Sequence, residues 1–293
     1  MIRRLATLLA TAALAAAPAP TEAAERSVVW SVRGEHNTVY LFGSIHVLRP
    51  GDAGPPRAAE AAYDDAEQLV MEIDMDDPAV ADPLAMAAQM QRYAQLPAGQ
   101  SLESVMGADY TAVAAYFRDA GLDAALLDGF APWFVGMMAL QLEVAKRGFD
   151  PAHGIEQQVT DRAVADRKPI LGLETPADQF AVLAGLSLPE QKRFLLMTLE
   201  ETGETDAKLD QMLTAWRTGD TATLARVLTE EFDEFPELYR PLTEDRNRAW
   251  VEQLAGLLDD RDDYLVVVGA LHLVGRNSVV DLLRQRGYRV TQH

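Results

Sequence analysis

Two segments of the chain repeat one pattern, a predicted buried strand that runs into Gly-x-x-His. They are Val39–His46 (VYLFGSIH) and Tyr264–His272 (YLVVVGALH). Short, continuous runs of β-branched and aromatic residues are typical of strands buried on both faces, and open α/β sheets bind ligands just beyond the carboxyl ends of such strands. Each glycine predicts that the backbone leaves the strand in a conformation that other residues resist. Because the chain has only five histidines, we expect the fold to bring His46 and His272 together to hold a metal ion.

The remaining elements favour an α/β protein. Residues 83–145 have the composition of helices with short breaks, and predicted helices separate the strands as in βα units. The first two strands are expected to form a hairpin. The sequence therefore predicts a central mixed sheet with flanking helices and a helical insertion, with the two Gly-x-x-His strand ends meeting at one site, in a single domain of residues 25–293. Apart from the last core strand, strands are expected at 28–33, 38–42, 68–74, 168–175 and 288–290.

Residues 1–24 have the layout of a secretory signal peptide. Arg3 and Arg4 precede the apolar run Leu5–Ala17, which is followed by small residues and prolines. The apolar run is short for a membrane span, so we expect cleavage between Ala19 and Ala24 rather than an anchor. The chain has no cysteine, which excludes disulfides and lipid attachment through cysteine. We therefore expect a periplasmic or secreted protein with no membrane span after cleavage.

The charge balance argues against one class of partner. Acidic side chains number 45 against 26 basic ones, which gives a formal net charge of -19. A surface of this sign repels phosphate backbones, so we expect no nucleic-acid partner.

Three carboxylates stand where a predicted strand or loop ends: Glu72, Glu156 and Glu174. Strands in a buried sheet seldom carry unpaired carboxylates, because burial of an unpaired charge is costly, although each of the three could instead be a helix cap or part of a surface ion pair. Two imidazoles and one carboxylate would leave a coordination position open for water, which is the pattern of a catalytic metal site. We therefore predict that His46, His272 and Glu72 bind a divalent metal, namely Mn, Co or Zn. Either Glu156 or Glu174 would accept a proton from the water or orient its neighbours.

Arg246 is a further candidate, with two interpretations. It could stabilise a developing oxyanion, or it could be an exposed helix arginine paired with Glu244 or Asp245. The histidines also have a simpler interpretation, since a lone histidine after a strand is usually a structural hydrogen-bonding residue. No His-Glu-x-x-His, Gly-x-Ser-x-Gly or glycine-rich phosphate motif is present, and no cysteine nucleophile is available.

Taken together, these motifs resemble the TraB/PrgY/GumN family, which is related to the Tiki metalloproteases and more distantly to the erythromycin esterase and ChaN groups. The resemblance covers essentially the whole mature chain. It implies an α/β fold with both histidines at the site and, for the Tiki branch, peptide cleavage that depends on a divalent metal. By position it carries over His46, His272, Glu72, Glu156, Glu174 and Arg246. The motifs are LFGSIH at 41–46, MEID at 71–74, GIE at 154–156, LET at 173–175, Arg246-Asn247, and VGALH at 268–272.

The sequence thus favours a metal-dependent hydrolase, most simply a peptidase with a peptide or protein substrate. Two alternatives remain: a non-catalytic protein that binds a peptide or small ligand, and an ester or lactone hydrolase of the erythromycin esterase kind that works without metal. The metal, the substrate and the oligomeric state stay open.

Overall fold

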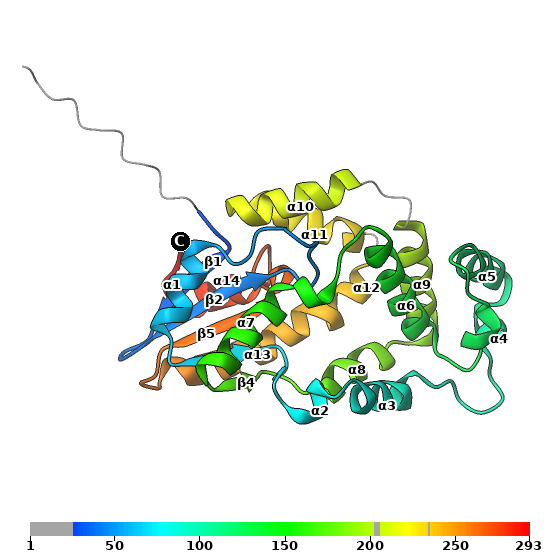
Figure 1. Cartoon of the computed structure of the whole chain (residues 1–293), viewed down its shortest axis with the longest axis horizontal. Helices are drawn as coiled ribbons and strands as arrows, with labels where there is room; N and C mark the ends of the chain where they lie inside the picture. The colour runs from blue at the N-terminus through cyan, green and yellow to red at the C-terminus, as the bar shows by residue number, and fades with distance from the viewer. Residues whose placement is uncertain (1–25, 202–205, 234) are drawn as a thin grey trace, which may run out of the picture.

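The computed structural model describes residues 26–201, 206–233 and 235–293, and the strands among them form one mixed sheet (Figure 1). The strand order is β4-β3-β5-β2-β1-β6. Strands β4, β3, β5 and β2 run parallel, while β1 pairs antiparallel with both β2 and β6. The predicted α/β class with a mixed sheet and an N-terminal hairpin is confirmed. The strands are β1 (Val29–Arg33), β2 (Thr38–Ser44), β3 (Gln68–Met71), β4 (Ile170–Gly172), β5 (Tyr264–Gly269) and β6 (Val290–Gln292).

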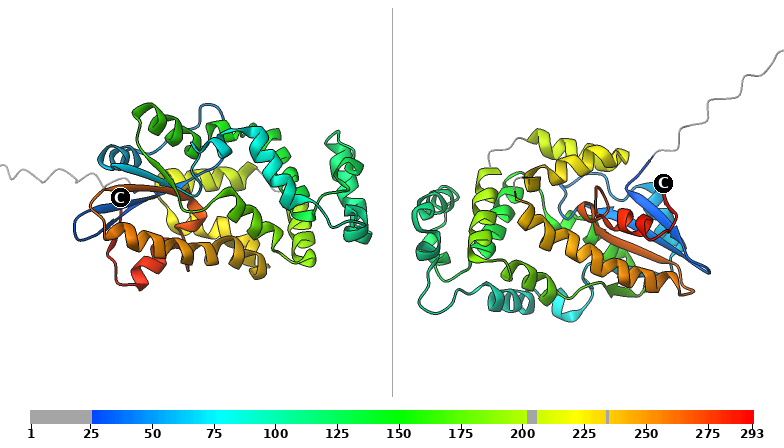
Figure 2. Two further views of the ribbon diagram at one scale, coloured as in Figure 1. Left: turned by 90° about the horizontal axis from the view of Figure 1, so that it is seen from below. Right: turned by 180° about the vertical axis from the view of Figure 1, so that it is seen from behind.

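Helices cover both faces of this sheet. Figure 2 shows α1 and α7 on one face, with α13 and α14 on the other. The helices are α1 (Arg57–Asp65), α2 (Pro78–Ala81), α3 (Pro83–Ala94), α4 (Leu102–Met106), α5 (Tyr110–Asp119), α6 (Pro132–Lys146), α7 (Ile155–Asp166), α8 (Pro176–Ala184), α9 (Leu188–Glu201), α10 (Asp206–Thr218), α11 (Thr221–Thr229), α12 (Pro236–Tyr239), α13 (Asp245–Leu258) and α14 (Val279–Gln285). Short 3-10 turns and one π-helical turn, Arg240–Glu244, join them.

The main core lies between the sheet and these helices. Every residue of β5 is buried, as its run of valines predicts for a strand covered on both faces. Strands β2 and β3 flank β5 in register, with Ser44 opposite Gly269 and Met71 opposite Val267. The carboxyl ends of these parallel strands therefore reach the same edge of the sheet.

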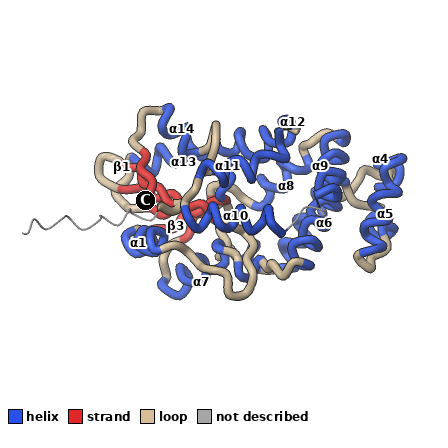
Figure 3. The backbone as a smooth tube through the Cα atoms, turned by 90° about the horizontal axis from the view of Figure 1, so that it is seen from above, coloured by secondary structure: helices blue, strands red, loops and turns tan. Residues whose placement is uncertain are grey.

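A second group of helices lies beyond that edge (Figure 3). Helices α4, α5, α6 and α9 share one apolar cluster around Phe117 and Leu195, and a neighbouring cluster surrounds Trp133 and Leu238. Segment 83–145 is thus helical with its own apolar packing, and it lies next to the strand ends rather than over a face of the sheet.

The expected signal peptide, residues 1–24, falls outside the described residues. In the part of the chain that the structure describes, none of the helices combines the length and apolar character needed to cross a bilayer.

Candidate functional site

Four adjacent parallel strands each end beside one of the predicted site residues. Because these strands run in the same direction, the residues after them meet at one edge of the sheet. Across the sheet they are Glu174 after β4, Glu72 after β3, His272 after β5 and His46 after β2.

His272 is buried, and its hydrogen bonds fix its tautomer. Its Nε2 lies 3.2 Å from Nη1 of Arg246, and its Nδ1 lies 2.7 Å from Oδ1 of Asn247. A guanidinium can only donate, so Nε2 carries the lone pair and Nδ1 carries the proton. The amide of Asn247 agrees with this assignment, because its Nδ2 donates to the carbonyl of Asn277 at 2.9 Å. Burial, reinforced by the charge of Arg246, lowers the pKa of His272 to about 3, so this imidazole is neutral at physiological pH.

His46 has the opposite surroundings. Its side chain is 65% exposed, and Nδ1 lies 2.6 Å from Oε1 of Glu156. The same carboxylate oxygen accepts the hydroxyl of Ser44. The charge of Glu156 raises the pKa of His46 to about 9 in the metal-free protein. Because an ionised carboxylate only accepts, Nδ1 carries a proton, and when the ring is neutral Nε2 carries the lone pair.

Glu72 lies close to both histidines and is held by three donors. The backbone N–H of Gly269 donates to Oε1 at 2.8 Å, and Arg246 and Gln179 donate to Oε2 at 2.7 and 3.2 Å. Oε1 is also 3.9 Å from Nε2 of His272. Burial acts to raise the pKa of Glu72, but the neighbouring imidazoles and the guanidinium outweigh it and lower the pKa to about 2. Glu72 is therefore ionised over the whole physiological range.

Arg246, in the first turn of α13, links these groups. Its Nε and Nη2 bind both oxygens of Glu174, its Nη2 also binds Glu72, and its Nη1 donates to Leu242 O and His272. All five guanidinium N–H groups are therefore in use. The surface interpretation of Arg246 is wrong, because the partners Glu244 and Asp245 belong to Arg248 instead. Arg248, and not Arg246, makes the surface ion pairs, because α13 turns residue 246 toward the strand ends.

Glu174 and Glu156 each stand at the start of a helix. Glu174 precedes Thr175, the N-cap of α8, and besides Arg246 it accepts the indole N–H of Trp250 at 2.8 Å. Glu156 follows Gly154, where a Cβ would lie 2.1 Å from the carbonyl oxygen of His46. The glycine therefore lets α7 approach the segment after β2 closely enough for Glu156 to reach His46. Oε2 of Glu156 is buried and has no hydrogen-bond partner among the described residues.

The glycines of the two Gly-x-x-His segments stand at crowded positions, and the prediction of an unusual backbone conformation is wrong. Neither Gly43 nor Gly269 has a positive φ, and Gly269 has φ -51° and ψ 136°, which any residue can adopt. A Cβ on Gly43 would lie 3.2 Å from Cα of Ala270. A Cβ on Gly269 would lie 2.9 Å from Nε2 of His46 and 3.3 Å from Oε1 of Glu72. The second glycine thus keeps open the space that these two side chains share.

The histidine tautomers at this site favour metal binding, whereas the position of Arg246 opposes it. Both histidines have Nδ1 engaged by a partner, as metal-ligating histidines usually do, so Nε2 is the atom of each ring that could bind a metal. Arg246, however, lies against Nε2 of His272. Among the residues that the structure describes, no three His, Asp or Glu side chains are already arranged to hold a metal. The donor types fit a divalent cation, provided that the contact between Arg246 and His272 opens.

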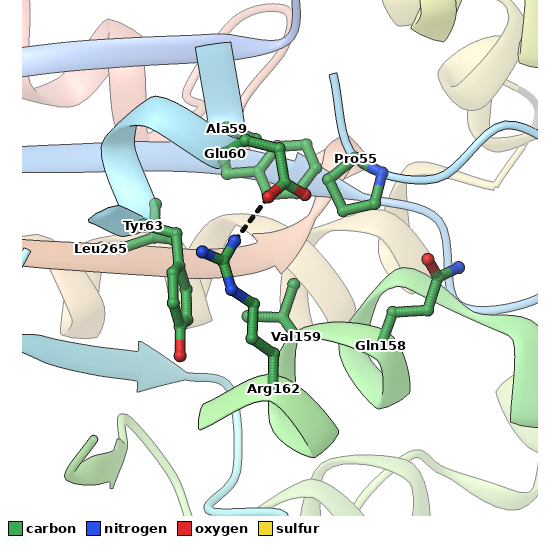
Figure 4. A pocket seen from close by; sticks show the side chains of 9 residues that line it. Pro55, Ala59, Glu60, Tyr63, Gln158, Val159, Arg162 and Leu265 are labelled. Atoms are coloured by element: carbon green, nitrogen blue, oxygen red, sulfur yellow. Dashed lines mark hydrogen bonds and ion pairs between the residues drawn. The ribbon is translucent and has the colours of Figure 1, made fainter. Parts of the chain in front are cut away.

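A hollow of about 390 Å³ opens beside His46, Glu72 and Glu156. Its other lining residues are Met71, Ile73, Met75, Pro151, Ala152, Gln157 and Gln179. A smaller hollow between α1 and α7 contains none of the predicted site residues; there Arg162 pairs with Glu60 and lies over the ring of Tyr63 (Figure 4). The first hollow therefore gives a ligand access to His46, Glu72 and Glu156, and a further hollow of about 500 Å³ is lined by Glu174 and Arg246.

Four residues whose side chains contact the predicted site were not assigned a role from the sequence, and one of them is Trp250, whose indole N–H donates to Glu174. Asn247 and Ser44 fix the orientation of His272 and Glu156, and Gln179 donates to Glu72. Asn247 and Ser44 stand inside the motifs quoted above, which is a signal for them. Gln179 lies on α8 with no pattern that marks it.

Comparison with known proteins supports one family. A profile of the TraB/PrgY/gumN family matches residues 28–292. The uncharacterized protein YbaP of Escherichia coli (strain K12) is 27% identical over 247 residues, which cover 84% of this chain and 87% of that protein. An uncharacterized protein of Treponema pallidum (strain Nichols) is 26% identical over 270 residues, covering 88% of this chain and 80% of that protein. Metalloprotease TIKI2 of Xenopus tropicalis is 26% identical over 322 residues, covering 90% of this chain and 59% of that protein. No solved structure matches the chain.

Proposed function

The chain belongs to the TraB/PrgY/gumN family, and from that membership and the geometry of the strand-end site we propose that it is a metal-dependent hydrolase that cleaves peptide bonds. The similarity to a protein named as a metalloprotease supports a hydrolase of this kind. The observation that carries the proposal is the closeness of Glu72 to both His46 and His272, with both imidazoles held through Nδ1.

In the proposal His46, His272 and Glu72 hold the metal through two imidazole Nε2 atoms and a carboxylate. When bound, the metal would supply Lewis-acid chemistry, because it acidifies water and polarises a carbonyl. The Asn247 amide keeps the lone pair of His272 on Nε2, and Glu156 does the same for His46. Mn, Co and Zn all suit these donors.

The two remaining carboxylates differ in what they can still accept. Both oxygens of Glu174 are bound by Arg246, and one also by Trp250. Glu156 keeps Oε2 without a donor and lines the hollow. We therefore assign proton transfer to Glu156, directly or through His46, and positioning of Arg246 to Glu174. Arg246 can stabilise an oxyanion only after it releases one of its present partners.

The test is metal binding combined with a peptide-cleavage screen under chelator control. The parent is expected to bind Mn, Co or Zn by calorimetry and to cleave members of a peptide panel, with activity lost in chelator and in His46→Ala. His36→Ala is the matched control, because His36 is an exposed turn histidine whose one ion pair is with Glu35. A parent protein that binds none of the three metals, or a His46→Ala variant with parental cleavage, would refute the proposal.

One observation favours a second candidate, an ester or lactone hydrolase that needs no metal. Arg246 already places a cation against both His272 and Glu72. In this candidate the His46–Glu156 pair moves protons at His46 Nε2, and Arg246 supplies the positive charge. Turnover that is insensitive to chelators and to added metal would select this function over the metallopeptidase.

We also propose that the protein acts in the periplasm or outside the cell. The support is the charged, apolar and small-residue pattern of residues 1–24. Sequencing the N-terminus of the protein recovered from a periplasmic extract tests this, and an intact Met1 found only in the cytoplasm would contradict it.

A further inference from the structure

The hollow beside His46 and Glu72 has an apolar wall for which the proposed chemistry has no use. Met71, Ile73 and Met75 come from the end of β3 and the segment after it, and Pro151 and Ala152 come from the turn before α7. Among the described residues that line this hollow there is no lysine or arginine.

Of the two methionines in this wall, Met71 is held in place and Met75 is freer to adjust. Met71 is fully buried and its sulfur accepts the hydroxyl of Thr160 at 3.3 Å, while Met75 is half-buried and packs against the main core. Methionine side chains adjust to ligands of different shape. A volume of about 390 Å³ lies within the usual range for small-ligand sites and exceeds the needs of one side chain.

Apart from His46, the charged groups around the hollow are carboxylates. Glu72 and Glu156 stand at its polar end, and Asp74, Asp76 and Asp77 flank Met75 in the chain. An acidic side chain placed on this wall would meet carboxylates of like charge and lose its water. An uncharged apolar side chain would instead bury area against methionine and isoleucine.

We propose that this hollow recognises an apolar side chain of leucine or methionine size, next to the peptide bond that is cleaved, and rejects aspartate and glutamate at that position. The inference rests on the proposed peptidase function and adds the class of residue that the enzyme selects. The amides of Gln157 and Gln179, which also line the hollow, already donate to Asp161 and Glu72, and the amide oxygen of each is suited to accept a hydrogen bond from the backbone of such a peptide.

The test measures binding, so that it does not depend on turnover. The protein carries ¹³C-methyl methionine, and the methyl signals of Met71 and Met75 are assigned by substitution and followed by NMR. The probes are N-acetyl-leucine amide and N-acetyl-aspartate amide, each titrated with and without Zn²⁺, which is diamagnetic and leaves the methyl signals visible. The leucine probe is expected to shift the Met71 and Met75 signals, and to bind at least about tenfold more tightly than the aspartate probe.

Three variants sharpen the result. Met75→Glu is expected to weaken the leucine probe about tenfold or more, and Met75→Leu to retain it. Leu84→Glu places the same charge on α3 at a side chain that is 81% exposed, and is expected to bind like the parent. A methyl spectrum that matches the parent elsewhere shows that each variant is folded.

Each outcome decides a separate claim. Equal affinity for both probes, or parental affinity in Met75→Glu, overturns the inference. Selective binding of the leucine probe by a protein that cleaves no peptide overturns the peptidase function but leaves the apolar recognition site. Cleavage of peptides without any preference for an apolar residue overturns the inference alone.

Discussion

Replacement of Arg246 by methionine tests whether the guanidinium is the buried link between the strand ends. The Arg246 side chain is 15% exposed, and its partners Glu72 and Glu174 are 14% and 12% exposed. The change removes all five donors and the guanidinium charge that both poorly solvated carboxylates contact. Breaking a buried ion pair from one side costs about 3–5 kcal/mol, so we expect a loss of that size in the free energy of unfolding.

Arg248→Met is the matched control, on the same helix and two residues further along. Arg248 is 47% exposed and pairs with Glu244 and Asp245 at the surface, where a pair contributes about 0–1 kcal/mol. Both variants are unfolded in urea at pH 7 with chelator present, and the extrapolated free energies are compared with that of the parent. A loss below about 1 kcal/mol in Arg246→Met, or equal losses in both variants, would refute the reasoning.

The pH dependence of the same variant supplies a second check. Without Arg246, Glu72 loses one of the positive charges that lower its pKa, so its pKa in the folded protein rises from about 2. The folded variant then takes up a proton at a higher pH than the folded parent does, so the deficit of the variant shrinks as the pH falls from about 5 to about 3. A deficit that grows over this range would contradict the assignment.

Three further predictions concern the histidines. In Gly269→Ala the added Cβ would lie 2.9 Å from His46 Nε2, so we expect the exposed ring to shift by a few tenths of an ångström, and metal affinity and any cleavage to fall about tenfold. The control Gly256→Ala, with open space at its Cβ, should leave both unchanged. Parental metal affinity in Gly269→Ala would contradict the argument that Gly269 keeps space open for His46. Since the pKa of His46 in the folded protein is raised to about 9, the contribution of His46 to stability is fully present below pH 6.5 and is lost as the pH rises through 9. In chelator, His46→Gln should therefore have a lower melting temperature than the parent at pH 6 and the same melting temperature at pH 9.5. A difference in melting temperature that grows with pH would contradict this prediction. Asn247→Leu removes the acceptor of the buried His272 Nδ1–H, so we expect the free energy of unfolding to fall by about 1–3 kcal/mol. The single Nδ1–H tautomer of His272 should also be lost in ¹⁵N NMR spectra. An unchanged tautomer would show that Arg246 alone determines the tautomer of His272.

The strand ends could be predicted from the sequence because they depend on local pattern. Val- and Tyr-rich runs identify β2 and β5, and parallel pairing then places the residues after them at one edge. The place of Arg246 could not be predicted, because its nearest acidic residues in the chain, Glu244 and Asp245, suggest a surface pair. Its actual partners lie 72 and 174 positions away, and only the packing of α13 selects them.

The steric reason for the glycines also could not be predicted from the sequence. A glycine after a strand is usually explained by its own backbone angles, which are local. At Gly269 the constraint is the ring of His46, which belongs to a different strand. The expected function of these glycines failed because steric contacts between distant segments leave no mark on the residue itself.

The spacing of the strands also sets the spacing of the site residues that follow their carboxyl ends. Neighbouring strands in a sheet repeat at roughly 4.8 Å, so the order Glu174, Glu72, His272, His46 is spaced by backbone hydrogen bonds rather than by the helices between the strands. A connecting helix can then lengthen, shorten or be replaced during evolution while the four side chains keep their intervals. The chemistry of the site and the shape of the surface around it are free to change at different rates.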